Sequence, residues 1–131
     1  MAGYSGTPLV RKLGIKAESR VLLDGAPEDF ELPGVDADDK ATGGPYDVIL
    51  SFCPDLARLA ERWPELHALT TPAGALWIAW PKRSSGIRTD VTENLVRDFA
   101  LANGRVDVKV CAIDETWSGL KHVIRVTDRS R

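Results

Sequence analysis

The fold is decided by residues 47–80, which read DVILSFCPDLARLAERWPELHALTTPAGALWIAW. Residues 47–53 and 74–80 are short apolar runs bounded by breakers, which is typical of buried parallel strands. Between them, helical spacing of apolar residues predicts a helix from about residue 54. The residues of that stripe are Leu56, Leu59, Trp63 and Leu66. Pro64 should kink or split the helix. A strand, a helix and a strand in succession predict an α/β sheet.

The segment before this stretch predicts one more buried strand. Residues 20–24, RVLLD, form an apolar run that ends at the breakers 25–27. Residues 7–14 predict a short helix, because Thr, Pro and Gly stand at its N-cap, its first position and its end. Residues 28–46 are polar and have room for at most one short strand, near 32–35.

The segment after it predicts a helix and a hairpin. Asp90 and Glu93 have the spacing of a capping box, so a helix should begin there. Its apolar stripe is Val91, Leu95, Phe99 and Ala102. Apolar and polar residues alternate over 106–113, and residues 120–126 predict a last strand. Because only the five residues 115–119 join these two strands, the strands must be antiparallel.

We therefore expect an α/β fold with an open, mostly parallel twisted sheet that ends in a terminal antiparallel β-hairpin. The length of 131 residues fits a single domain, residues 1–131. Within it, residues 1–18 hold the N-terminal helix and its lead-in, and residues 105–126 hold the terminal hairpin. Residues 127–131 are expected to be a disordered tail.

Composition argues against several classes of partner. Seventeen basic and nineteen acidic residues give a net charge of −2, so no nucleic acid is expected to bind. The longest stretch without charged residues, 66–81, contains a turn signal, so we expect no membrane span. Residues 1–7 lack the basic start and the apolar run of a secretory signal, which favours a cytoplasmic location. Cys53 and Cys111 are 58 positions apart, which fits no metal site.

The strand order indicates where a ligand would bind. In open α/β sheets, ligands lie beyond the carboxyl ends of the parallel strands. This rule selects residues 24–27, 53–54 and 80–90, together with the hairpin tip at 115–119. No Walker pattern occurs in any of these segments.

The loop at 80–90 is the most informative of them. Lys82, Ser85 and Arg88, with Arg83 beside them, would hold a phosphate or carboxylate group at a helix start. Trp80 and Trp117 would flank that group. The alternative is a solvated basic loop with both tryptophans in the core. The candidate ligand-binding residues are Asp24, Gly25, Ala26, Pro27, Trp80, Lys82, Ser85, Arg88, Trp117 and Ser118.

Other reactive residue types favour structural roles. Cys53 ends a buried strand with no histidine placed beside it, and it is interpreted as a buried thiol. His122 shares a strand face with apolar residues and is interpreted as a core histidine. Asp36, Asp38 and Asp39 lack the glycine and the glutamate that a calcium loop needs at its later positions. Catalytic residues are not assigned, because Gly-x-Ser-x-Gly does not occur.

Several segments resemble class I S-adenosylmethionine-dependent methyltransferases. Residues 13–16, LGIK, and 20–25, RVLLDG, are similar to the lead-in and first strand of that family. Residues 46–52 resemble its fourth strand and residues 69–78 its fifth. The terminal hairpin corresponds to the reversed last pair that distinguishes this fold from dinucleotide-binding dehydrogenases. The resemblance implies a truncated, Rossmann-like methyltransferase fold.

The whole chain resembles more closely the short bacterial proteins of the domain of unknown function 3052 family. The resemblance lies in residues 3–9, GYSGTPL, and in 25–27, 80–82 and 117–120. It implies the same methyltransferase-like fold with no established activity.

Two departures from the methyltransferase pattern bear on the cofactor. The family binds S-adenosylmethionine on a Gly-x-Gly-x-Gly turn, where this chain keeps Gly25 but has Pro27 and Asp29. The family also holds the ribose with an acidic residue at the end of its second strand, for which Glu31 and Asp36 are the nearest candidates. The polar segment before the next strand is short, so one or two of the usual seven strands should be missing.

Three functions follow from these observations. The first is a non-catalytic methyltransferase-like domain that binds a small anionic or aromatic ligand at the carboxyl edge of the sheet. The second is an S-adenosylmethionine-dependent enzyme with a minimal cofactor site built on residues 24–27 and the loop after 74–80. The third is an interaction or regulatory subunit that binds a protein partner or forms a homodimer through the terminal hairpin.

Overall fold

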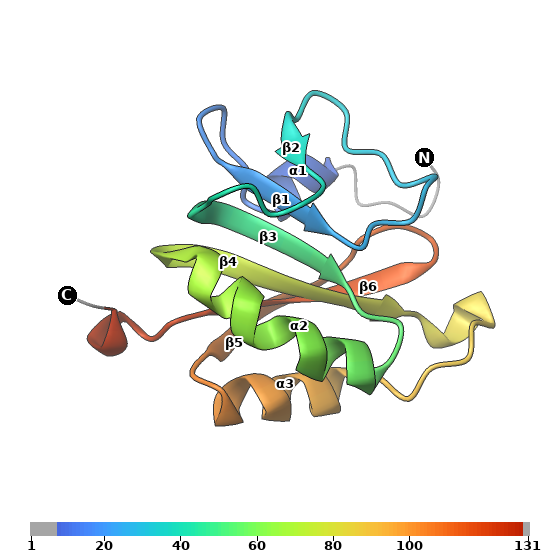
Figure 1. Ribbon diagram of the computed structural model, residues 1–131. Coiled ribbons are helices and arrows are strands. Elements are labelled where there is room, and N and C mark those ends of the chain that lie inside the picture. Colours follow the sequence, from blue (N-terminus) through green and yellow to red (C-terminus); the bar gives the residue numbers. More distant parts are fainter. Residues whose placement is uncertain (1–7, 130–131) are drawn as a thin grey trace.

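Residues 8–129 are described by the computed structural model, and they form one mixed six-stranded sheet with helices on both faces (Figure 1). The strands are β1 Val21–Asp24, β2 Ala37–Asp38, β3 Tyr46–Phe52, β4 Thr70–Pro81, β5 Val106–Ala112 and β6 Trp117–Val123. The helices are α1 Leu9–Lys12, α2 Leu56–Leu69 and α3 Glu93–Ala102, and short 3-10 turns cover Arg83–Ser85 and Val126–Asp128.

The strand order is β2-β1-β3-β4-β6-β5. β1 pairs in parallel with β2 and β3, and β3 pairs in parallel with β4. β6 lies antiparallel between β4 and β5. The expected α/β sheet with a terminal antiparallel hairpin is confirmed.

Two apolar layers hold the sheet together. On one face, α2 and α3 pack over β3, β4 and β6 through a core that includes Leu59, Trp63 and Val96 (Figure 1). On the other face, α1 and the segment before β2 cover a second core around Trp77. The Trp77 indole Nε1–H donates a hydrogen bond to the Leu13 carbonyl at 3.2 Å, which ties the end of α1 to the central strand.

The structure corrects four of the predicted elements. The short strand before β3 lies at Ala37–Asp38 rather than near 32–35, where a turn at Leu32 takes its place. α2 is not split at Pro64, since it runs from Leu56 to Leu69 with this proline inside it and with buried side chains on both sides of it. The last strand begins at Trp117, so the link of the hairpin is shorter than expected.

The apolar stripe of α3 is the fourth correction. Val96 and Ala100 are buried, whereas Leu95 is 43% exposed and Ala102 is exposed. Val91 is buried and Phe99 packs against the same core, as the sequence predicts, so only the positions of Leu95 and Ala102 are wrong. The helix starts at Glu93 and is capped by Thr92.

A β-bulge interrupts β5, so its side chains do not alternate as the sequence suggests. Val106 faces Val123 across the ladder, but after the register shift at Asp107/Lys109, Val110 faces Leu120. Their partners Val123 and Leu120 are three residues apart in β6 and therefore point to opposite faces of the sheet. Val106 and Val110, which pair with them, thus lie on opposite faces as well.

The two ends of the chain fall partly outside the described residues. Thr7 and residues 130–131 lie there. β6 ends at Val123 rather than at residue 126, and the turn Val126–Asp128 joins the last residue of the expected strand to the first two residues of the expected disordered tail. Within residues 8–129, no helix has the length and apolar composition to cross a membrane. Over the same range, no three His, Cys, Asp or Glu side chains gather as metal ligands would.

Candidate functional site

The carboxyl ends of β1, β3 and β4 lie at one edge of the sheet, beside the first turns of α2 and α3 (Figure 1). Backbone hydrogen bonds join the loops of this edge. Cys53 N–H donates to the Ala79 carbonyl at 2.8 Å, and Lys82 N–H donates to the Thr116 carbonyl at 2.8 Å. The segments selected by strand order therefore follow neighbouring strands at one edge.

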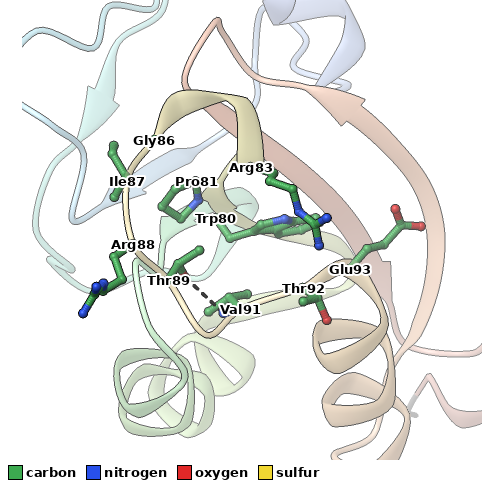
Figure 2. A pocket seen from close by; sticks show the side chains of 10 residues that line it. All are labelled: Trp80, Pro81, Arg83, Gly86, Ile87, Arg88, Thr89, Val91, Thr92 and Glu93. Carbon is green, nitrogen blue, oxygen red and sulfur yellow. Dashed lines mark hydrogen bonds between the residues drawn. The ribbon is translucent and has the colours of Figure 1, made fainter.

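The loop between β4 and α3 borders a cleft of about 440 Å³. Figure 2 shows the loop arching from Pro81 through Gly86 to the start of α3, with the Trp80 ring inside the arch. The lining residues are Trp80, Pro81, Arg83, Gly86, Ile87, Arg88, Thr89, Val91, Thr92 and Glu93. Trp80 and Arg88 are thus brought together as expected, whereas Lys82 and Ser85 do not line the cleft.

The cleft carries positive charge that no neighbouring carboxylate neutralises. Arg83 and Arg88 are exposed and form no ion pair with any of residues 8–129. The one carboxylate in the lining, Glu93, is bound 2.5 Å from Arg97. Figure 2 shows the side chains of Arg83 and Arg88 extending to opposite sides of the loop, so a small anion would meet one arginine at a time near the N-terminal end of α3.

Ser85 shapes the loop from within. Its hydroxyl donates to the Lys82 carbonyl at 2.7 Å and accepts from Ile87 N–H at 3.1 Å. Gly86 follows with a φ of +77°, a conformation that glycine adopts without strain. Ser85 therefore holds the turn that presents Arg83 and Arg88, rather than contacting a ligand itself.

The end of the loop is attached to α2. Thr89 donates its hydroxyl hydrogen to the Pro54 carbonyl at 2.6 Å, and its oxygen accepts from Val91 N–H at 3.0 Å (Figure 2). Asp90 accepts a hydrogen bond from Leu56 N–H at 2.8 Å, so it caps α2. The prediction that Asp90 caps α3 is wrong, since the Thr92 hydroxyl accepts from the third residue of α3 at 3.2 Å.

The two tryptophans near this edge lie in different cores. Trp80 is 7% exposed and packs in the layer beneath α2 and α3. Trp117 packs in the opposite layer, edge-on to Phe52 at 5.1 Å between ring centroids. Ser118 pairs with Trp80 across β4 and β6. The indoles therefore do not face each other across one ligand, and the interpretation of both as packing residues fits their positions.

A second polar cluster lies at the carboxyl end of β1. Asp24 is 8% exposed, and its carboxylate accepts a hydrogen bond from the Ser51 hydroxyl at 2.7 Å. Arg62 of α2 adds contacts of 3.0 and 3.2 Å to the same carboxylate, and Arg58 adds one of 3.5 Å. The pKa of Arg62 is raised, chiefly by its hydrogen bond with Asp24.

The turn after β1 has little free space above it. Gly25 has a φ of +72°, and a Cβ atom there would lie 2.7 Å from Nη2 of Arg58. Ala26 packs against the second core, and the Pro27 carbonyl accepts from Phe30 N–H at 3.0 Å. The guanidinium of Arg58 thus stands where a ligand would approach this turn.

Neither Cys53 at this edge nor His122, which pairs with Leu76 farther back along β4, is activated as a nucleophile or base. Cys53 is fully buried, and burial raises the pKa of its thiol to about 11. His122 is buried as well, and desolvation lowers the pKa of its imidazole to about 4. Both residues therefore stay neutral near pH 7, as expected of core side chains.

A comparison with known protein families finds no match to this chain, and neither does a comparison with curated proteins.

Sequence reasoning does not find Arg58 and Arg62, which lie on a helix rather than in a loop after a strand. Their spacing of four residues places both on one helix face, and that signal is visible in the sequence. Nothing in the sequence shows that this face meets Asp24, because the contact joins residues 34 and 38 positions apart.

Proposed function

We propose that this chain is a compact methyltransferase-like domain that binds a small anionic ligand at the carboxyl edge of its sheet and transfers no methyl group. A sheet of parallel strands in which only β6, between β4 and β5, is reversed supports the methyltransferase-like architecture. Membership in the domain of unknown function 3052 family, which the sequence resembles, remains a prediction.

One observation carries the ligand class. Arg83 and Arg88 line a cleft of about 440 Å³ at the start of α3, and neither has an acidic partner among residues 8–129. Guanidinium groups bind carboxylates and phosphates through paired hydrogen bonds, and the first turn of a helix favours negative charge. A carboxylate or phosphate group is therefore the chemistry that this cleft fits.

The residues present do not fit S-adenosylmethionine at the turn after β1. The Arg58 guanidinium lies over Gly25, and Pro27 lacks a backbone donor. At the end of β2, Asp38 is already bound to the Tyr46 hydroxyl at 2.5 Å and to Thr42 at 2.9 Å. Its other oxygen has no partner among residues 8–129, so the weight against the enzyme hypothesis comes from the turn after β1.

An amide NMR titration tests this function. Inorganic phosphate at constant ionic strength should shift the amides of residues 83–93, and S-adenosylhomocysteine should shift none near Gly25. Replacing Arg88 by alanine should weaken phosphate binding about three- to tenfold, since one charge-assisted contact is lost. Arg125→Ala is the matched control, because Arg125 is an exposed arginine outside the cleft.

Two results would count against the proposal. If Arg83→Ala and Arg88→Ala leave phosphate affinity unchanged, the cleft is not the binding site. Saturable shifts around Gly25 with S-adenosylhomocysteine would instead favour the methyltransferase with a minimal cofactor site.

A further inference from the structure

Arg58 extends from the first turn of α2 back over the end of β1. Its backbone N–H donates to the Asp55 carboxylate at 2.8 Å, which fixes the start of the helix. Its side chain reaches the turn after β1, where Nη2 lies 3.5 Å from Oδ2 of Asp24. The position that a Gly25 side chain would take is 2.7 Å from the same nitrogen, so the guanidinium covers this turn directly.

Asp24 is satisfied without Arg58. Ser51 donates to its carboxylate at 2.7 Å, and Arg62 contacts both of its oxygens through Nε at 3.2 Å. The contact of Arg58 at 3.5 Å is at the outer limit of a hydrogen bond. Arg62 and Ser51 therefore hold the carboxylate, and Arg58 is bound only loosely to it.

Most of the hydrogen-bonding capacity of Arg58 is unused. A guanidinium has five N–H donors. Within residues 8–129, the side chain of Arg58 has the long contact with Asp24 as its one hydrogen bond or ion pair, and it is 35% exposed. The unused donors form a planar fork at the mouth of the turn, and this shape matches a carboxylate or phosphate.

We propose that Arg58 and the Gly25 turn form a second oxyanion subsite at the carboxyl edge, separate from the cleft of Arg83 and Arg88. The guanidinium binds a carboxylate or phosphate group with its outer donors, while its Nη2 keeps the long contact with Asp24. The subsite extends the proposed function. It rests on that function in one respect, namely that the ligand is a small anion. The same guanidinium occupies space that a methyltransferase cofactor would need.

The competing explanation is that Arg58 only stabilises the fold by pairing with Asp24. The two explanations differ in what Asp24→Asn does. Removing a negative charge a few ångströms from a bound anion should tighten phosphate binding about threefold at the Gly25 turn, by Coulomb's law in a solvent-like dielectric. A purely structural Arg58 predicts no tightening.

The experiment follows the Gly25 and Ala26 amides by NMR in titrations with sodium phosphate, with sodium acetate and with sodium chloride at matched ionic strength. The phosphate and acetate arms distinguish the two oxyanions, and the chloride arm removes the effect of salt. We expect saturable shifts in the parent chain, at least tenfold weaker binding in Arg58→Ala, and unchanged binding at this turn in Arg88→Ala. Arg125→Ala is the control, as an exposed arginine at the other end of the chain.

The outcomes separate this inference from the proposed function. Shifts of residues 83–93 without shifts at Gly25 overturn the subsite and leave the proposed function standing. Shifts at neither place overturn both, and shifts at Gly25 that persist in Arg58→Ala overturn the role of Arg58. Arg58→Lys keeps the charge without the planar fork, so it should bind with intermediate affinity, and it replaces the alanine variant if that variant does not fold.

Discussion

Arg105 is a buried cation that is solvated by the protein. It is 1% exposed, and its Nε donates to Nδ1 of His67 at 2.9 Å. Its other nitrogens donate to the Thr70 hydroxyl and to the carbonyls of His67, Gly74 and His122. Burial lowers the pKa of Arg105 to about 10, so it remains charged at pH 7. No carboxylate of residues 8–129 pairs with it, and the carbonyls of His67, Gly74 and His122 supply the compensating dipoles.

Replacing Arg105 by methionine should therefore destabilise the protein. The variant keeps an apolar stem of similar length but leaves buried carbonyls without donors, which costs about 2–3 kcal/mol of unfolding free energy. Urea denaturation measures the difference. The control is Arg125→Met at an exposed position, where a change within about 0.5 kcal/mol is expected. Equal effects in the two variants would contradict the structural role of Arg105.

His122 makes the stability depend on pH. Its Nδ1–H donates to the Leu76 carbonyl at 3.1 Å, while Nε2 is buried with no partner among residues 8–129. Desolvation lowers the pKa of His122 to about 4 in the folded chain, below the value of about 6.5 in an unfolded chain. As the pH falls through this window, the unfolded chain binds the proton first. The contribution is fully present above about pH 6.5 and is lost towards pH 4.

The unfolding free energy should accordingly fall between pH 6.5 and 4, at no more than about 1.4 kcal/mol per pH unit from this residue. Denaturation at a series of pH values measures the slope. In His122→Asn, whose amide can still donate to Leu76, the curve should be flatter although the protein is less stable. An unchanged slope in that variant would assign the pH dependence to other groups, such as His67, whose pKa is also lowered by burial and by the charge of Arg105.

At the scale of elements, two neighbouring side chains cap two different helices. Asp90 caps α2 from another loop, and Thr92 caps α3 locally. Asp90→Ala and Thr92→Ala should each cost about 1 kcal/mol. Amide hydrogen exchange should locate the effects, with faster exchange of Leu56 in the first variant and of Leu95 in the second. Faster exchange of Leu95 in Asp90→Ala would contradict this assignment.

The elements that the sequence predicts well are those whose signal is local. β1, β3 and the buried half of β4 are short apolar runs, and the stripe of α2 stands at regular spacing, so their existence follows from pattern alone. In α3, the sequence predicts the packed Phe99 but misses the buried Val96 and Ala100. Asp90 matches a capping pattern for α3 but serves α2. The bulge in β5 cannot be predicted, since Val108 looks like any other apolar residue of an alternating strand.

At the scale of the whole molecule, the open edges of the sheet are protected. β5 is one outer strand, where Val108 and Val110 are 55% and 48% exposed, and β2 at the other edge has two residues. The bulge at Asp107/Lys109 bends β5 and disrupts the row of donors and acceptors that a second strand would need.

We therefore expect sedimentation equilibrium to give the mass of one chain, 14.3 kDa, at micromolar concentration. A dimer that is dispersed by Val110→Lys would contradict the protective role of the bulge and favour association through the terminal hairpin. Lys40→Glu is the control for a change of surface charge away from β5. Lys40 is exposed, and this variant should leave the mass from sedimentation equilibrium unchanged.

The candidate site is predictable only where it follows directly from strand order. That rule selects the Trp80–Arg88 loop and the Asp24 turn, and both lie at the carboxyl edge. It does not reveal which cations face a cleft, since Arg83 lines it and Lys82 does not. Nor does it reveal Arg58, whose relevance depends on how α2 packs across the sheet end.

The hydrogen bond from Leu56 N–H to Asp90 has a consequence for how the two anion positions would communicate. It joins the loop that borders the cleft to the helix turn that carries Arg58, so a ligand that reorders the loop also acts on the start of α2. Such coupling is reciprocal by thermodynamic linkage: whatever factor one bound anion contributes to the affinity of the second, the second contributes to the first. If this one hydrogen bond carries the coupling, phosphate should bind cooperatively at the two positions in the parent chain. The two positions should bind independently in Asp90→Ala, and phosphate binding isotherms of the two proteins measure the difference.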